Sequence, residues 1–303
     1  MRESVPLPAT APSNHKQLWV MRETVLKIFT VVFLVSLFCS LLVTSAATLL
    51  KPYQEVNRRL ERIVYLLKAA GIEATREDAL ALFEAHVQPA LVDLQEDRLV
   101  EASRLGIDPV TFSFERESRK PDLRVAISPE WARKIGFRYR PRVMPIFFVS
   151  LDPRRPPSEE RFDRLVLYLV GKGLWSTLHG FLALENDLRT IYTITFFQHR
   201  ETPGLGGEID NRRWQALWRG KLAYDRRGEV AISVIKGRVD PTSPKAPYLV
   251  DGLTGATLTT RGVNHMVRYW LGRGGYGGYL QKLRERRGKA LARRAGRLTS
   301  PSS

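Results

Sequence analysis

The sequence predicts a single membrane-spanning helix followed by an α/β domain of the α+β type. Residues 28–50 contain no charged side chain, and at about 1.5 Å per residue they cover roughly 35 Å, more than a hydrocarbon core of about 30 Å. Beyond them, apolar residues recur at helical spacing from Val56 to Leu67. Stretches rich in β-branched and aromatic residues then fill residues 163–235. Helices therefore precede a strand-rich body.

A secretory signal peptide is the competing interpretation of residues 28–50, because TSAAT resembles a small-residue cleavage site. A signal peptide has an apolar region of about 7–15 residues. This stretch is longer and begins after a polar lead, so we interpret it as a transmembrane helix. The flanking charges do not decide its orientation, because residues 1–27 carry four Lys/Arg and residues 51–68 carry five.

The composition is strongly basic. The 303 residues carry a formal net charge of +17, which favours anionic partners. Eight Lys/Arg and one Glu between Lys282 and Arg297 supply +7 of it, so we expect residues 273–303 to form a basic C-terminal tail. From Gln281 onward we expect a frayed helix followed by disorder, and after about residue 282 no apolar stripe is long enough to dock firmly. From Gln281 onward the tail lacks interleaved aromatic residues, so membrane lipid is favoured over nucleic acid as its partner. The single cysteine, Cys39, excludes an intrachain disulfide.

The order of elements follows from turn and cap signals. Gly71 is expected to stop the first helix, Thr75 with Asp78 resembles a capping box for a second one, and Pro89 is expected to close it. This gives a helical entry over residues 51–90 and a sheet body over about 121–250. The predicted strands are 122–128, 142–150, 163–171, 173–185, 190–199 and 228–237.

The stretch DGLTGATLTT, residues 251–260, is the first candidate site. Gly255 and Ala256 allow a bulky group to approach the backbone, and a predicted helix follows Thr257. Thr259 or Thr260 can cap that helix, and a helix start suits a phosphate. No base stands beside Thr257 in the sequence, and the spacing is not that of a P-loop. From pattern alone, a strand–turn–helix junction with capping threonines explains the stretch as well.

Two further stretches are candidates. The loop ETPGLGGE, residues 201–208, exposes backbone N–H groups to a ligand, although a long hairpin loop has the same composition. The segment GLWS places Trp175 at a strand start, where a core tryptophan is equally consistent. The histidines show no metal-ligand spacing, so no metal site is expected.

Together these stretches resemble the NqrC family, whose members are the C subunits of the sodium-translocating NADH:quinone reductase. They are LKPYQEVNRRLERIVYLLKAAGI, GLWSTLHGFLALENDLRTIYTITFFQHRETPGLGGEIDNRRW and VDGLTGATLTTRGVNHMVRYWLG, in the family's order behind its single membrane helix. The likeness covers roughly residues 25–272. The chain also fits the family's flavin-transferase target, an Asp, two variable residues, Ser/Thr, Gly, Ala and a final Thr/Ser, although Thr254 stands where the family commonly has serine.

The resemblance implies a cofactor, a fold and a location. FMN would be joined through its phosphate to Thr257, with FAD as donor and a flavin transferase as maturation partner. The fold would be an FMN-binding domain with a mainly antiparallel sheet flanked by helices. Residues 1–27 would lie in the cytoplasm, residues 28–50 in the bacterial inner membrane, and the domain of residues 51–272, which ends in the flavin-threonine loop and helix of residues 251–272, in the periplasm. The cofactor-binding residues would be Thr257, Asp251, Thr254, Gly255, Ala256, Glu201, Thr202, Gly204, Leu205, Gly206, Trp175, Ser176 and Thr177.

The function implied is that of an electron relay among the other membrane subunits of the complex. No residue is predicted to be catalytic, and the chain has no dinucleotide motif with which to oxidise NADH itself. The nearest rival is RnfG, the corresponding component of the Rnf electron-transport complex; GLWS and the helix after the membrane favour the sodium-pump family. A membrane-anchored lipid- or nucleic-acid-binding protein and an assembly subunit without cofactor are further alternatives.

Overall fold

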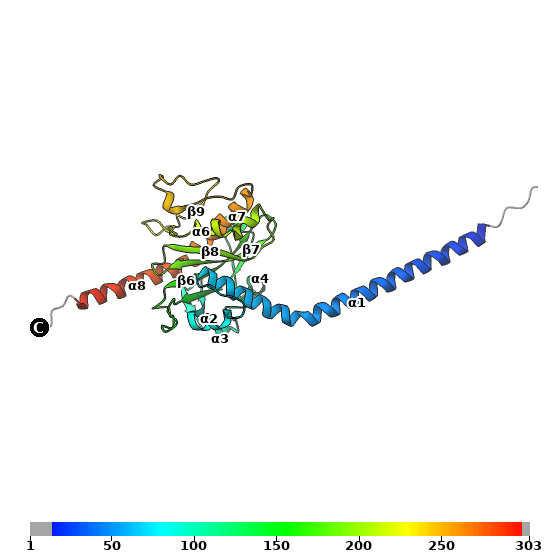
Figure 1. Cartoon of the computed structure of the whole chain (residues 1–303), viewed down its shortest axis with the longest axis horizontal. Coiled ribbons are helices and arrows are strands. Elements are labelled where there is room, and N and C mark those ends of the chain that lie inside the picture. Colours follow the sequence, from blue (N-terminus) through cyan, green and yellow to red (C-terminus); the bar gives the residue numbers. More distant parts are fainter. Residues whose placement is uncertain (1–13, 299–303) are drawn as a thin grey trace, which may run out of the picture. The chain divides into compact units, whose positions relative to one another are not determined.

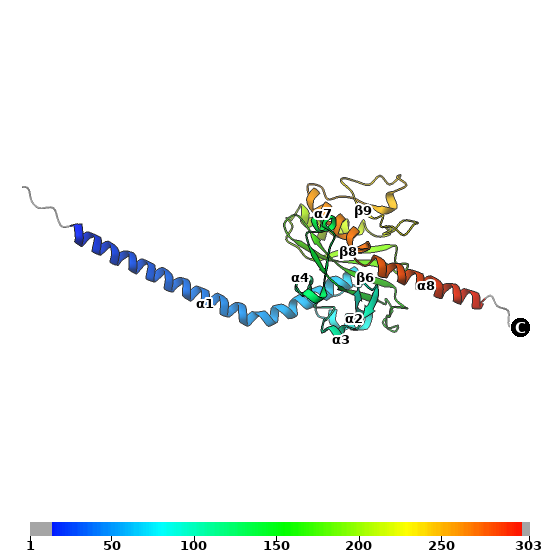
Figure 2. The ribbon, with the colours of Figure 1, turned by 180° about the vertical axis from the view of Figure 1, so that it is seen from behind.

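The computed structural model describes residues 14–298 and divides into two compact units, one up to Asn57 and one from Arg58 onward. Two parts of the chain lie outside the described residues: residues 1–13 of the predicted cytoplasmic segment 1–27, and residues 299–303 of the predicted tail. Helix α1, Asn14–Ala69, contains Pro52 and passes from the first unit into the second. Figure 1 labels the elements for which there is room, and Figure 2 shows the same ribbon from behind.

Helix α1 confirms the predicted continuous helix after the apolar stretch. Val25–Ala69 is the one helix among the described residues that is long and apolar enough to cross a membrane, and its apolar window has no buried residue. The helix ends as predicted: Gly71 has φ +76°, its N–H donates to the carbonyl of Lys68, and that of Ile72 donates to Leu67. This closure satisfies carbonyls that the helix end would leave unpaired.

A six-stranded antiparallel sheet forms the centre of the second unit, in the order β2-β1-β5-β6-β7-β8. The strands are β1 Val87–Asp93, β2 Arg98–Val100, β5 Val143–Val149, β6 Arg164–Lys172, β7 Thr177–Glu185 and β8 Ile191–Gln198. Two small sheets accompany it: β3 Arg124–Ala126 with β4 Tyr139–Pro141, and β9 Ser233–Val234 with β10 Leu249–Val250.

Short helices connect the strands. They are α2 Ala79–His86, α3 Ala102–Leu105, α4 Phe114–Ser118, η1 Pro121–Leu123, α5 Pro129–Ile135, η2 Gly206–Asp210, α6 Arg212–Ala216 and η3 Ala246–Tyr248. Two longer helices follow the last strand: α7 Thr257–Leu271 and α8 Gly277–Leu298.

Helices cover both faces of the central strands (Figures 1 and 2). Side chains alternate between the faces of a strand, so the Tyr168 side chain and a carbon added at Gly171 of β6 would lie on opposite faces. Tyr168 lies 5.9 Å from the guanidinium of Arg62 on α1, whereas Gly171 lies against Met266 of α7. The interiors of β5, β6 and β7 are therefore buried on both faces, which explains their continuous apolar runs.

The first strand lies where the sequence predicts helix. The helical entry predicted to residue 90 ends at His86, and Val87 begins β1 with Pro89 inside it. Pro89 is tolerated because β2 pairs only with residues 91–93, so this part of β1 has a neighbour on one side only. The capping interaction is half formed, since the Asp78 carboxylate accepts from the N–H and hydroxyl of Thr75 at 2.6 and 2.9 Å.

One other expectation is wrong. Residues 228–237 form only the two-residue strand β9, outside the main sheet. The first part of the predicted tail of residues 273–303 packs on the domain, because Tyr276, Tyr279, Leu280 and Leu283 are buried. The Tyr276 hydroxyl lies 2.9 Å from the carbonyl oxygens of Pro145 and Tyr168. The start of α8 therefore belongs to the folded domain.

Gly262→Ala should destabilise the second unit. A Cβ at Gly262 would overlap the backbone carbonyl of Lys172, so α7 would have to move off β6. We expect a loss of roughly 1–3 kcal/mol of unfolding free energy, the cost of overpacking. Gly288→Ala is the matched control, because Gly288 is exposed on α8 with no atom within 4 Å of the added carbon. Denaturant unfolding of the detergent-purified chain measures both, and equal stability of the two variants would contradict the close packing of α7.

Candidate functional site

Glu201 joins the three candidate stretches. Its carboxylate accepts hydrogen bonds from the N–H groups of Leu174, Trp175 and Ser176 at 3.1, 3.0 and 3.2 Å. It also accepts from the hydroxyl of Thr259 on α7 at 2.6 Å, and the residue is only 5% exposed. The turn before β7, the glycine-rich loop and the start of α7 therefore meet at one carboxylate.

Glu201 is held in its ionised form. Burial alone would raise its pKa, but hydrogen bonds from Thr259 and from the backbone of Trp175, Leu174 and Ser176 outweigh burial and lower it. Donors aimed at a carboxylate favour the charged state.

The lowered pKa predicts a pH dependence of stability. A depressed carboxylate pKa contributes stability above the unfolded pKa of about 4.3, and this contribution is lost as pH falls through the folded value. At pH 7, Glu201→Gln should be less stable than wild type by about 1–3 kcal/mol. The difference should shrink as the pH falls below the ordinary glutamate range. Unfolding curves of both proteins from about pH 7 to pH 3 test this; a difference that stays constant with pH would contradict an ionised Glu201.

Thr257 is the first residue of α7 and is exposed. Gly255 has φ +76°, and an added carbon there would lie 3.0 Å from Leu205, so the two loops are in close approach. The residue before the helix, Ala256, provides no side-chain cap, and the Thr260 N–H makes the first helical bond to its carbonyl. Among the described residues, no side chain accepts from the N–H groups of residues 257–259, which suits an anion.

The predicted capping threonines serve other bonds. Thr259 donates to Glu201, and the Thr260 hydroxyl accepts from the Leu253 N–H at 3.1 Å. Asp251 holds the preceding loop: its carboxylate accepts from the Val239 N–H and its carbonyl from the Trp214 indole, both at 2.9 Å. Neither interaction involves Thr257.

The remaining predicted residues occupy the surface around these segments. Thr254, Thr202, Gly204 and Leu205 are exposed and Gly206 is buried. The Thr202 carbonyl accepts from the N–H groups of Leu205 and Gly207, which closes a tight turn. Trp175 is 70% exposed, and Ser176 and Thr177 are half-buried.

A cavity of about 330 Å³ borders Thr257 and brings in residues that the sequence reasoning does not select. Lys236, Arg261 and His265 line it. Burial lowers the pKa of His265, and the charges of Lys134, Arg261 and Arg268 act in the same direction. Lys236 and Arg261 are thus the cationic groups facing this space, a distribution that suits a phosphate.

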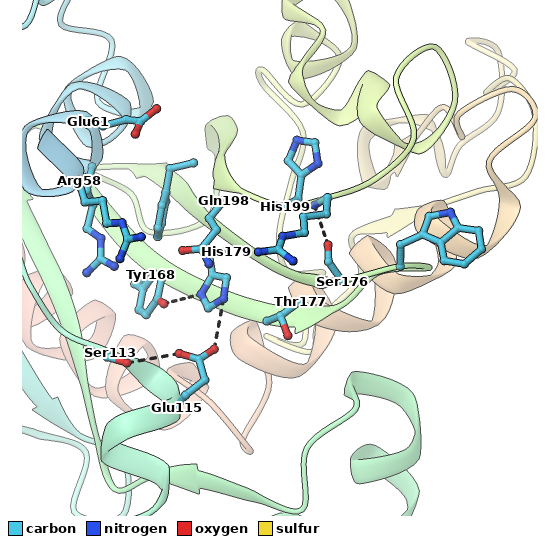
Figure 3. A pocket seen from close by; sticks show the side chains of 14 residues that line it. Arg58, Glu61, Ser113, Glu115, Tyr168, Ser176, Thr177, His179, Gln198 and His199 are labelled. Carbon is cyan, nitrogen blue, oxygen red and sulfur yellow. Dashed lines mark hydrogen bonds and ion pairs between the residues drawn. The ribbon is translucent and has the colours of Figure 1, made fainter. Parts of the chain in front are cut away.

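A larger cavity of about 860 Å³ begins at Trp175, Ser176 and Thr177 (Figure 3). At its wall, the His179 ring nitrogens lie 2.7 Å from the Tyr168 hydroxyl and 3.3 Å from the Glu115 carboxylate. No local pattern pointed to this group beyond the histidine itself. The other lining residues of the cavity are Arg58, Glu61, Arg62, Ser113, Phe197, Gln198, His199 and Arg200.

Comparisons with known proteins assign these segments to a family. Residues 173–272, which contain all three candidate stretches, match the FMN-binding domain family. The chain is 40% identical over 268 residues to the C subunit of the Na(+)-translocating NADH-quinone reductase of Pseudomonas aeruginosa, covering 87% of this chain and 98% of that protein. The Yersinia pestis counterpart is 36% identical, with 87% of this chain and 94% of that protein covered.

Solved structures match as well. The crystal structure of Shewanella oneidensis NqrC aligns with a TM-score of 0.65 at 26% identity, covering 76% of this chain and 99% of that chain. The fold and the family match thus define a protein with an FMN-binding domain that follows a helix able to span a membrane. More particularly, the chain belongs to the NqrC family of Na(+)-translocating NADH-quinone reductase subunits, which confirms the resemblance drawn from the sequence.

Proposed function

We propose that this chain is the FMN-carrying, membrane-anchored electron-relay subunit of a sodium-translocating NADH:quinone reductase, with FMN attached through its phosphate to Thr257. The observation that carries the proposal is the exposed Thr257 hydroxyl at the uncapped start of α7, inside the matched FMN-binding domain. The match and the relatives support FMN and membership of the complex, so its other subunits are the expected partners.

The residues around Thr257 fit a phosphate and an aromatic ring. Free N–H groups and the Lys236 and Arg261 side chains favour a negative charge there. Four large apolar side chains on the joined segments face solvent: Leu174 at 41%, Trp175 at 70%, Leu205 at 45% and Leu258 at 52% exposure. An isoalloxazine ring would give them an apolar partner. Bound FMN would supply the one- and two-electron chemistry, while the chain binds and orients it.

Flavin attachment implies a flavin transferase as maturation partner. In the proposed step the Thr257 oxygen forms a phosphoester bond with the phosphorus of the FMN half of FAD. The bond from that phosphorus to the bridging oxygen of the pyrophosphate breaks, AMP leaves with this oxygen, and the Thr257 hydroxyl loses its proton. The chain contributes the acceptor oxygen and an open approach, since Gly255 has no side chain. Helix α1 supports the membrane anchor, and membrane lipid is its proposed environment.

Thr257→Ala should abolish covalent flavin while leaving the fold intact. The change removes the acceptor oxygen at an exposed position and should cost no more than about 1 kcal/mol. Thr257→Ser keeps the oxygen and should retain some flavin. Asp251→Ala keeps the acceptor oxygen but removes the carboxylate that accepts from the Val239 N–H, so loading should fall because the loop is recognised less well. In-gel flavin fluorescence after denaturation, with an active transferase coexpressed, measures all three. Wild-type fluorescence in Thr257→Ala would assign the attachment to another residue.

Residues 51–303 should lie in the periplasm. The family resemblance motivates this orientation, because the charges flanking the apolar stretch do not decide it. A reporter fused after Ser303 should be active only if it functions in the periplasm, and a cytoplasm-specific reporter at the same position should be silent. The reverse pattern would require the opposite topology.

A further inference from the structure

The Glu201 carboxylate is fully engaged inside the domain. Its Oε1 accepts from the N–H groups of Trp175 and Ser176, and the Ser176 hydroxyl lies 3.4 Å away. Its Oε2 accepts from the Leu174 N–H and the Thr259 hydroxyl. Two carboxylate oxygens offer about four lone-pair sites. Donors within the protein therefore occupy all the lone-pair sites of the Glu201 carboxylate. This arrangement favours a structural role for Glu201 over the flavin-ring contact that the resemblance implies.

The geometry points to Glu201 as a positioning residue that fixes the distance between the turn of residues 173–176 and the first turn of α7. The turn carries the segment expected to lie near the flavin ring, and α7 begins at Thr257. Glu201 thereby sets the spacing between the attachment oxygen and the ring contacts. The inference rests on the proposed function, because this spacing matters to a flavin only if Thr257 carries one.

Two glycines leave the space in which the Glu201 carboxylate lies between these segments. An added carbon at Gly173 would overlap the Glu201 Oε1 atom. One at Gly206 would lie 2.5 Å from the Thr259 hydroxyl and 3.0 Å from Oε2. Any side chain at either position would separate the segments that Glu201 joins, so glycines in two of the three segments make the close approach possible.

The loop that bears Glu201 is itself fixed at both ends. The Glu201 N–H donates to Nδ1 of His199 at 3.2 Å, and the other ring nitrogen of His199 lies 2.7 Å from the Asp210 carboxylate. Glu201 is therefore carried by a loop that other hydrogen bonds hold in place. Among the described residues, one hydrogen bond joins Glu201 to α7, the one donated by Thr259. That bond can be removed while the negative charge of Glu201 stays in place.

Thr259→Val removes the hydroxyl with little change in volume. The flavin-free full chain, purified in detergent and incubated with FAD and active transferase, gives the initial rate of attachment. Visible circular dichroism of the attached flavin reports how firmly the ring is oriented. We expect attachment roughly tenfold slower, the equivalent of one lost charge-assisted bond, and a weaker dichroic band. Thr259→Ser should restore both.

Glu208→Gln is the matched control, because Glu208 lies in the same loop and its carboxylate accepts from Asn211 at 2.7 Å. It should behave as wild type. A Thr259→Val protein that loads at the wild-type rate with an unchanged dichroic band overturns the positioning role alone, provided wild type loads flavin. Failure of wild type to load would overturn the proposed function and this inference with it. If Thr259→Val does not fold, Glu201→Gln decides by the same criteria.

Discussion

The packing of α7 on β6 determines where the candidate ligand-binding segments lie. Gly171 accommodates Met266, Gly262 lies against the carbonyl of Lys172, and the Trp270 indole donates to the Val170 carbonyl at 2.7 Å. These contacts fix α7 along the end of β6. Since β6 leads into the turn of residues 173–176, the start of α7 is brought to that turn, and the bond between Thr259 and Glu201 becomes possible.

Acidic and basic side chains have different roles at this site: the carboxylates hold loops, and the cations line the cavity at Thr257. Asp251 and Glu201 accept from backbone N–H groups, so both carboxylates stabilise loops. Lys236 and Arg261 line the cavity at Thr257. An anionic ligand at Thr257 would therefore meet cations and free N–H groups, while the negative charges of the same motifs are already stabilised by donors.

Local patterns predict much of the fold and the boundaries of the candidate segments. The stop at Gly71 and the strands β5, β6 and β8 follow from signals a few residues long, and the motif around Thr257 lies where a helix begins. Strand β1 is hidden because Pro89 resembles a helix stop, and its position at a partly free edge is a tertiary property. The role of Glu201 is equally hidden, since its partner Thr259 is 58 residues away and no local pattern pairs them.

The start of the C-terminal helix α8 is part of the packed domain although it lies beyond the family match. The match to the FMN-binding domain ends at residue 272, but burial continues through Leu283. Lys282 and Arg286 pair with Asp97 and Glu159, so charges that resemble a solvated run in the sequence fasten α8 to the domain. Beyond them α8 extends past the body of the second unit (Figures 1 and 2). The match to the FMN-binding domain therefore stops before the buried side chains at the start of α8 that complete the packed domain.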